Sequence, residues 1–222
     1  LCFEHGSFET TRISEDPGLD RTLKASMVEA LQAGQSQLVE LSTSSDTFKL
    51  FIEILAPKRL IYICGHEYDT IPLMEICRKL NWEIHLVCKP TKINKQQYQL
   101  ADKIIDNKDP SALSYMEDRH TALITMNHDF ATDKAILRQA QNTTLPYIGI
   151  LGPQSRGEKM LKELNITDAA ILERLHYPVG LDLGAEEPEE VAISIVSEII
   201  AAHYGRQGGF LKFRQAPIHD RT

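Results

Sequence analysis

The chain has 222 residues, 42% hydrophobic and 25% charged, which is the balance of an ordinary soluble globular protein. A net charge of −7 argues against a primary nucleic-acid role, because nucleic-acid-binding domains usually present a basic face. No apolar run approaches the ~18 residues of a membrane-spanning helix and no signal peptide is evident, so a cytoplasmic protein without membrane contact is expected.

The four cysteines give no metal or disulfide pattern. Cys2, Cys64, Cys77 and Cys88 contain no CxxC pair and no zinc-finger spacing. Buried, reduced thiols are therefore predicted. A sulfur-carrying role for Cys88 is an alternative.

The first 56 residues predict a small α+β segment. Residues 1–18 look irregular, and the chain begins at Leu1 in mid-pattern without a Met, which indicates that the natural N-terminus lies upstream. Asp20 is expected to cap a helix that runs to Ala33 and stops at Gly34. Two strands of alternating apolar residues are expected next, at Gln37–Leu41 and Phe48–Leu55.

From residue 57 to 222 the pattern changes to alternating strands and helices. Such alternation with short apolar strands predicts an α/β fold with a doubly wound parallel sheet. The expected strands are Arg59–Ile63, Glu83–Val87, Lys103–Ile105, Thr121–Met126 and Tyr147–Ile150. The expected helices are Ile71–Leu80, a weak one near Asn94–Gln99, Phe130–Ala140, Ser155–Leu164 with a Ser155–Glu158 capping box, and Pro188–Tyr204. The polar tail Gln207–Thr222 is expected to lie over the surface.

The loop after the first strand of this alternation departs from a dinucleotide-binding fingerprint. Gly65 occupies the first glycine position, but Glu67 stands at the second, where a carboxylate would repel a phosphate. The next strand ends at Val87 and Cys88 instead of the acid that binds ribose hydroxyls. Ordinary NAD(P) binding is therefore not expected.

Three later strands end in polar residues and glycines. Ligands of open parallel sheets lie beyond the carboxyl ends of the strands, so these ends predict one site made of several loops. At the first of these three strand ends, His128 and Asp133 are candidates for contacting a phosphate; the alternative is that Asn127 or Asp129 caps a helix and His128 satisfies neighbouring backbone groups. No metal site is expected there, because a third ligand with suitable spacing is missing.

The other two ends add a possible anion seat and a glycine-rich loop. Gly149, Gly152 and Arg156 surround the start of a helix whose N–H groups suit an anion, unless Arg156 only pairs with a surface carboxylate. His176, Gly180 and Asp182 follow the last end. Asp182 is a candidate for accepting N–H groups of a ligand or, alternatively, for holding its own loop through backbone amides.

Three segments carry a resemblance to a known family. They are MNHDFATD, PYIGILGPQSR and HYPVGLDLGAEEPEEVAISIVSEI, and the match covers roughly Ile52 to His219. The chain resembles the XdhC/CoxI family of accessory proteins for xanthine-dehydrogenase-type molybdoenzymes. The first loop keeps Gly65 and Asp69 of the family pattern but carries Glu67, Tyr68 and Cys88 instead of its usual residues.

The resemblance implies a Rossmann-like C-terminal domain that binds molybdenum cofactor and delivers it to a client enzyme. Such a protein acts as a chaperone-like carrier and needs no catalytic residue. The implied partners are a molybdenum hydroxylase such as xanthine dehydrogenase, a cysteine desulfurase, and a second copy in a homodimer. An upstream domain with a Gly-rich, Cys-containing motif is also implied. Two alternatives stay open: an NAD(P)-dependent oxidoreductase, and a dimeric scaffold that binds no small ligand.

Overall fold

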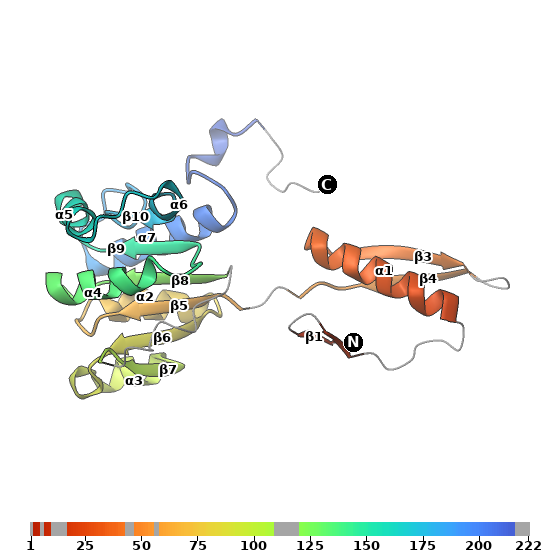
Figure 1. Cartoon of the computed structure of the whole chain (residues 1–222), viewed down its shortest axis with the longest axis horizontal. Coiled ribbons are helices and arrows are strands. Elements are labelled where there is room, and N and C mark those ends of the chain that lie inside the picture. The colour runs from red at the N-terminus through yellow and green to blue at the C-terminus, as the bar shows by residue number, and fades with distance from the viewer. Residues whose placement is uncertain are drawn as a thin grey trace. The chain divides into compact units, whose positions relative to one another are not determined.

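The computed structural model describes residues 2–4, 7–9, 17–42, 47–55, 58–108 and 120–215. The chain divides into two compact units, Leu1–Pro57 and Lys58–Thr222 (Figure 1). Each unit has its own sheet and its own buried residues, so each is described by itself.

The Leu1–Pro57 unit is a helix packed on a two-stranded sheet. Helix α1 (Pro17–Ala33) contacts the antiparallel pair β3 (Gln37–Ser42) and β4 (Thr47–Ile52). A second antiparallel pair is formed by β1 (Cys2–Glu4) and β2 (Ser7–Glu9), where the sequence suggested irregular structure. The start of α1 at Pro17 also shows that the expected cap at Asp20 is wrong, although Gly34 ends the helix with a φ of 65°.

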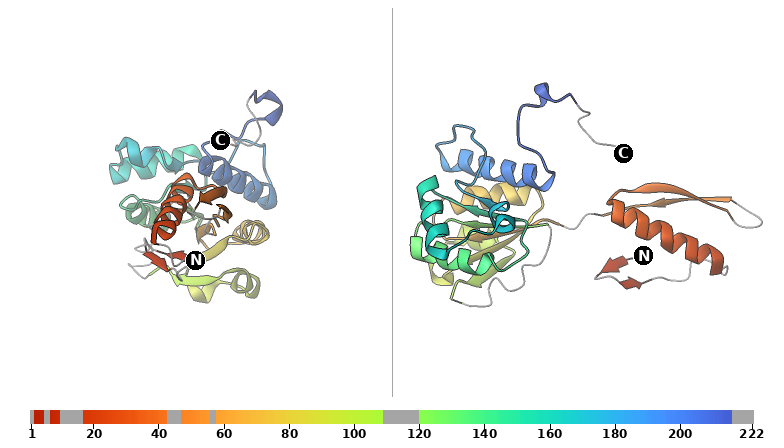
Figure 2. Two further views of the ribbon diagram at one scale, coloured as in Figure 1. Left: turned by 90° about the vertical axis from the view of Figure 1, so that its right-hand side faces the viewer. Right: turned by 45° about the horizontal axis from the view of Figure 1, so that its top comes forward.

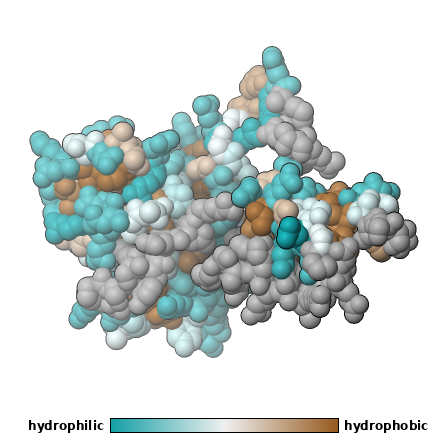
Figure 3. Space-filling model, turned by 45° about the vertical axis from the view of Figure 1, so that its right-hand side comes forward, coloured by the Kyte–Doolittle hydropathy of each residue, from teal (hydrophilic) through white to brown (hydrophobic). Residues whose placement is uncertain are grey.

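Apolar side chains of this unit lie on both faces of the β3–β4 sheet. Leu41 and Ile52 are buried together with Leu23 and Ala30 of α1. Figure 3 shows brown, hydrophobic areas among the hydrophilic surface of this unit. Several large apolar side chains of the unit are exposed: Leu38, Phe48, Phe51 and Leu55.

The Lys58–Thr222 unit contains one six-stranded parallel sheet with the order β10-β9-β8-β5-β6-β7. Its strands are β5 (Leu60–Cys64), β6 (Glu83–Cys88), β7 (Lys103–Asp106), β8 (Thr121–Thr125), β9 (Tyr147–Ile150) and β10 (Leu175–His176). The chain winds outward from β5 in one direction and, after β7, returns to β8 and winds in the other. This arrangement confirms the predicted α/β, Rossmann-like doubly wound sheet.

Helices cover both faces of the sheet. They are α2 (Thr70–Lys79), α3 (Lys95–Leu100), α4 (Phe130–Ala140), α5 (Gln154–Leu164), α6 (Ala169–Leu172) and α7 (Pro188–His203), with short 3₁₀ turns at Pro90–Lys92 and Leu211–Phe213. Apolar residues of α2 and α7 share one core cluster, and these two helices lie side by side (Figure 2). Residues of α4 and α5 fill the cluster on the opposite face.

Hydrophobic periodicity predicts this unit well. The expected strands and long helices agree with the observed ones to within one residue at each end. Three features differ. The short elements α6 and β10 were not expected, and α5 begins at Gln154 with Pro153 as N-cap and no side-chain cap, so the Ser155–Glu158 capping box is wrong. Instead, Gln154 Nε2 donates to Glu158 Oε1 at 2.9 Å.

Gly65 is required by a close approach of two chain segments. A Cβ built on Gly65 would lie 2.6 Å from the backbone oxygen of Met126, the residue that follows β8. That oxygen belongs to a backbone fixed by the hydrogen bond from Met126 N to Cys64 O, at 2.8 Å. The glycine therefore lets the ends of β5 and β8 meet.

We predict that Gly65→Ala lowers the free energy of unfolding by about 1–3 kcal/mol, because a backbone atom has little freedom to retreat. Urea denaturation measures the change. Gly209→Ala is the control, since a Cβ there meets nothing within 4 Å and that glycine has no positive φ. A Gly65→Ala protein as stable as the control would show that the backbone yields.

Candidate functional site

The winding of the sheet reverses between β5 and β8. These neighbouring strands pair in parallel, with Cys64 opposite Thr125 at their carboxyl ends. The chain leaves β5 toward α2 on one face and leaves β8 toward α4 on the other. In open α/β sheets this switch point leaves a crevice in which ligands bind. We use the name crossover crevice for the loops that follow β5 and β8 at this switch point, residues 65–69 and 126–129.

Two side chains from opposite loops meet over this crevice. His128 Nε2 lies 2.6 Å from Asp69 Oδ2, which joins the β8–α4 loop to the start of α2. His128 adopts a left-handed backbone conformation with a φ of 56°, and 56% of its side chain is exposed. A non-glycine residue in that region is uncommon and is often found where a side chain must be aimed at a particular point. The His128 ring is therefore partly exposed beside Asp69, at the carboxyl ends of β5 and β8.

Asp69 has one oxygen without a donor. Its Oδ1 atom is buried and accepts no hydrogen bond from any of the described residues. Asp69 also starts α2 without a side-chain capping bond, so helix capping does not account for its carboxylate. A buried acceptor left unpaired costs about 1–3 kcal/mol, and a ligand N–H group would remove that cost. Asp69 was noted in the sequence but not assigned to the site; its place directly after the central strand was the available signal.

A side chain of α3 holds the β5–α2 loop through hydrogen bonds. Gln97 is 1% exposed, and its amide donates to His66 O at 2.9 Å and to Thr70 Oγ1 at 2.8 Å. Thr70 Oγ1 in turn donates to Glu67 O at 2.7 Å. The loop is thus fixed through its carbonyl groups, which point toward α3. The Glu67 side chain is 54% exposed and lies 3.3 Å from His66.

A buried carboxylate connects the crevice to α5. Asp133 is 1% exposed; its Oδ1 accepts from the backbone N and side-chain Nδ2 of Asn127, at 3.2 and 2.9 Å. Its Oδ2 accepts from Arg156 Nη2 at 2.8 Å. Arg156 therefore pairs with a buried carboxylate and not with a surface one. Because Asn127 precedes His128, this network joins His128, Asp133 and Arg156 beside one strand end.

Basic groups surround the same strand end. Phe130 begins α4, and its ring faces three cations: Arg156 at 5.6 Å, Lys134 at 5.4 Å and Lys159 at 4.8 Å from the ring centre. Lys134 is neutralised by Glu163 at 2.6 Å. Asp129 caps α4 by accepting from Thr132 N at 2.7 Å, and this bond lowers the pKa of Asp129. The expected cap at Asp129 is thus present, and His128 is left for other contacts.

Gly149 and Gly152 lie along β9 and its loop. A Cβ on Gly149 would lie 2.5 Å from Val179 and 2.7 Å from Ile124, so this glycine is needed for packing inside the sheet. Gly152 has a φ of 123°, and a Cβ there would meet only Arg156, at 2.9 Å. Gly152 therefore shapes the turn into α5 next to the crevice.

His176 and Gly180 belong to a second group, centred on Glu198 of α7. The Glu198 carboxylate accepts from Tyr147 OH and, at 2.8 Å, from Gly180 N, and it lies 3.2 Å from His176 Nδ1. The His176 ring stacks on Tyr147 with centroids 4.1 Å apart. Within the described residues, no hydrogen bond joins this group to the crossover crevice. Glu198 was not expected from sequence, because it lies within the apolar stripe of α7.

Asp182 stands apart from both groups. It is exposed in the loop before α7, and no described residue donates to its carboxylate. The alternative in which Asp182 holds its own loop through backbone amides has no supporting hydrogen bond among the described residues, and contact with a ligand stays a prediction. Gly180 is fixed instead by its φ of 112° and by Ser194, whose Oγ would lie 2.4 Å from a Cβ there.

Three cysteines of the described part of the chain form no disulfide, and all three are buried: Cys64, Cys77 and Cys88. Burial raises the pKa of the Cys77 thiol to about 12 and, together with the charge of Asp106, that of Cys88 to about 11. A thiol that stays protonated and shielded from solvent is a poor nucleophile. This environment argues against a sulfur-carrying role for Cys88. Across the described residues no cluster of three or more His, Cys, Asp or Glu side chains suits a metal ion.

The strand order and the crossover crevice define a Rossmann-like domain. Comparison with known families then places the chain: it belongs to the XdhC Rossmann domain family, whose model matches residues 61–199. None of the helices in the described part of the chain is long and apolar enough to cross a membrane.

The chain is also similar to individual proteins. The chain is 28% identical over 156 residues to a probable xanthine dehydrogenase subunit of Bacillus subtilis (strain 168), a match that covers 69% of this chain and 46% of that protein. It is 32% identical over 103 residues to the uncharacterized protein YqeB of Escherichia coli (strain K12), covering 45% of this chain and 18% of that one. The chain thus spans less than half the length of either relative.

A crystal structure of a xanthine dehydrogenase from Bacillus halodurans is similar in fold, with a TM-score of 0.62 and 27% sequence identity. The superposition covers 86% of this chain and 66% of that chain. The likeness therefore extends beyond the segment that the family model matches.

We predict that Arg156→Met lowers the free energy of unfolding by about 2–4 kcal/mol, because it leaves the buried Asp133 carboxylate without its cation. Denaturant unfolding gives the value. Adding Asp133→Asn should restore part of the loss, and Arg138→Met, a change at an exposed arginine of α4, should have little effect. Equal stability of the two arginine variants would contradict a structural role for the pair.

A second prediction concerns Glu198. Burial alone would raise the pKa of Glu198, but the hydrogen bonds from His176, Tyr147 and Gly180 outweigh it and lower the pKa below its ordinary value of 4.5. A carboxylate with a lowered folded-state pKa contributes stability above its unfolded-state pKa, and this contribution disappears as the pH falls through the folded-state value.

Glu198→Gln should therefore lower the free energy of unfolding at pH 7 by about 1–3 kcal/mol and weaken its decline below pH 4.5. Denaturant unfolding between pH 3 and pH 7 measures both effects. Glu189→Gln, at an exposed position of the same helix, is the control. If both variants keep the wild-type pH dependence, Glu198 is not the charged centre of this group.

Proposed function

We propose that this chain is an accessory protein of a xanthine-dehydrogenase-type molybdoenzyme, and that its crossover crevice binds the molybdenum cofactor for transfer to that enzyme. The names of two similar proteins, one a probable component of a xanthine dehydrogenase and the other a xanthine dehydrogenase of known structure, support the link to such enzymes. The observation that carries the binding site is the unpaired oxygen of Asp69 beside His128 at the reversal of the sheet.

The residues at the crevice fit the chemistry of this cofactor. A pterin presents N–H donors along one edge, and the buried Oδ1 of Asp69 is an acceptor without a described donor. The cofactor phosphate would accept hydrogen bonds from His128 and from the guanidinium N–H groups of Arg156 that do not donate to Asp133. The first backbone N–H groups of α5 lie near these side chains. Arg156 and Lys159 lie near this strand end, so an anion could find cations here although the net charge of the protein is −7.

The proposed action needs no catalytic residue in this chain. The cofactor, when bound to the client, supplies the oxygen-transfer chemistry of molybdenum enzymes. This chain would hold the pterin edge, shield it from water and release it to a partner of higher affinity. A molybdenum hydroxylase such as xanthine dehydrogenase is the proposed partner; the homodimer and the cysteine desulfurase partner stay predictions.

The site offers little support for a nicotinamide dinucleotide. The β5–α2 loop has its carbonyl groups fixed by Gln97, and the Glu67 carboxylate is exposed where a fingerprint glycine would admit the pyrophosphate. At the end of β6, where an acid would bind the ribose, Cys88 is completely buried. An oxidoreductase that uses NAD(P) is therefore the weaker alternative.

The proposal is tested by titrating the full-length natural protein with molybdenum cofactor and following the pterin fluorescence. We expect saturable binding in the micromolar range, about −8 kcal/mol. His128→Gln and Asp69→Asn should each weaken it tenfold or more, which is about 1.4 kcal/mol. Glu173→Gln, which removes a charge at an exposed position after α6, should bind as the wild type does.

Two outcomes would contradict the proposal in different ways. Wild-type affinity in both crevice variants would move the site elsewhere. Absence of cofactor binding in the natural protein would reject the carrier role and favour a scaffold that binds only the client.

A further inference from the structure

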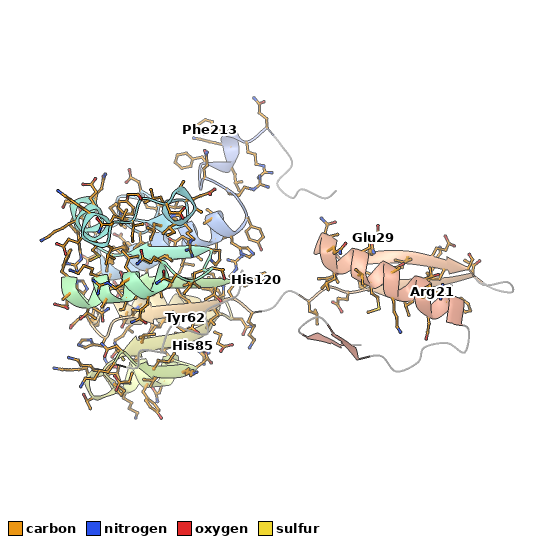
Figure 4. All side chains as sticks on the ribbon, in the orientation of Figure 1. Arg21, Glu29, Tyr62, His85, His120 and Phe213 are labelled. Atoms are coloured by element: carbon orange, nitrogen blue, oxygen red, sulfur yellow. The ribbon has the colours of Figure 1, made fainter. Side chains whose placement is uncertain are left out.

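A pocket lies at the opposite edge of the sheet from the crossover crevice. Its walls come from the starts of β5, β8 and β9 and from the last turn of α7, and its volume is about 130 Å³. Figure 4 labels His120 at this edge, directly before β8. Pockets for drug-sized molecules have volumes of ~300–1,000 Å³, so this one suits a small ion.

The pocket contains an arginine without an acidic partner. Among the residues that the structure describes, no carboxylate lies within ion-pair distance of Arg59. Its guanidinium group instead lies 5.4 Å from the ring centre of Trp82 and 5.2 Å from that of Tyr204. Burial lowers the pKa of Arg59, while Tyr204 acts in the opposite direction. A partly dehydrated cation between two aromatic rings is stabilised further by an anion.

Further polar groups line the same pocket. The rings of His120 and His203 lie 5.2 Å apart, and both residues are part of the pocket wall. Thr121, which is 2% exposed, also lines it, and its Oγ1 atom is buried without a hydrogen-bond partner in the described structure. A buried hydroxyl usually has a hydrogen-bond partner, so an unpaired hydroxyl on a residue of the pocket wall is available to donate to a ligand.

The interaction of cationic groups with the dipole of α7 explains only part of the pocket. Cations near a helix C-terminus are favourable, and His203 ends α7. However, the last carbonyl groups of α7 already accept from the backbone N–H groups of Tyr204 and Arg206. The dipole accounts neither for the unpaired Thr121 hydroxyl nor for the cavity that Thr121 and Arg59 both line.

We propose that this pocket binds a small oxyanion of phosphate or carboxylate type, held by Arg59, the Thr121 hydroxyl and the two histidines. The ligand oxygens would accept from the guanidinium group and from Thr121, while the apolar side chains Ala122 and Ile199 close the remaining wall. The site is independent of the cofactor site, because it lies at the amino ends of the strands.

The sole tryptophan of the chain provides the measurement. Trp82 contacts Arg59, so an anion at Arg59 should change its fluorescence. The full-length protein is titrated with inorganic phosphate and, separately, with acetate at constant ionic strength. We expect a saturable change with at least one of them, with Arg59→Gln weakening binding at least tenfold and Thr121→Val several-fold.

Controls separate binding from folding. Arg138→Gln makes the same charge change at an exposed position of α4, on the other face of the sheet, and should bind as the wild type does. Thr121→Val preserves side-chain shape and the Arg59–Trp82 contact, so it remains informative if Arg59→Gln is unstable. The proposal is overturned if neither anion gives saturable binding, or if folded Thr121→Val and Arg59→Gln proteins bind as tightly as the Arg138→Gln control.

Discussion

The contact between Gly65 and the backbone oxygen of Met126 is the constraint on which the candidate site depends. It brings together the ends of β5 and β8, the two strands at which the winding of the sheet reverses. Asp69 follows the first contact partner by four residues and His128 follows the second by two, so their meeting is a consequence of this approach. A side chain at position 65 would separate the two loops and with them the only described interaction that joins Asp69 to His128.

Glycines in this chain illustrate how one residue type serves different physical needs. The sequence suggested Gly149 beside a possible anion seat and Gly180 in a glycine-rich loop of the same site. In the structure, protein atoms occupy the space beside both: Ile124 and Val179 at Gly149, and Ser194 at Gly180. Gly152 differs, because its positive φ shapes the turn before α5 and its nearest neighbour is the flexible Arg156 side chain. Composition alone cannot distinguish these cases, since each depends on what a distant segment places opposite the glycine.

The fold was largely predictable, because it follows from local patterns. Short apolar strands alternating with amphipathic helices are sufficient to indicate a parallel sheet, and Pro188 and Gly205 mark the limits of α7 correctly. The sequence also predicted His128 and Asp133 after one strand end and Arg156 after the next, as parts of one site, because they closely follow β8 and β9. It did not predict their partners. Asp69 and Glu198 are distant in the chain from His128 and His176, and such pairings arise only when the helices pack on the sheet.

The anchoring of the β5–α2 loop by Gln97 has a consequence for how ligand preference is encoded in this domain. The shape of the loop depends on an amide from α3, about thirty residues further along the chain, as well as on the loop's own residues. Its carbonyl groups are already engaged, so the loop behaves as a rigid wall. Replacing the loop residues by those of a dinucleotide-binding protein would therefore introduce the motif residues without the backbone conformation that phosphate binding requires. The path of the β5–α2 loop is therefore a property shared by the loop and α3.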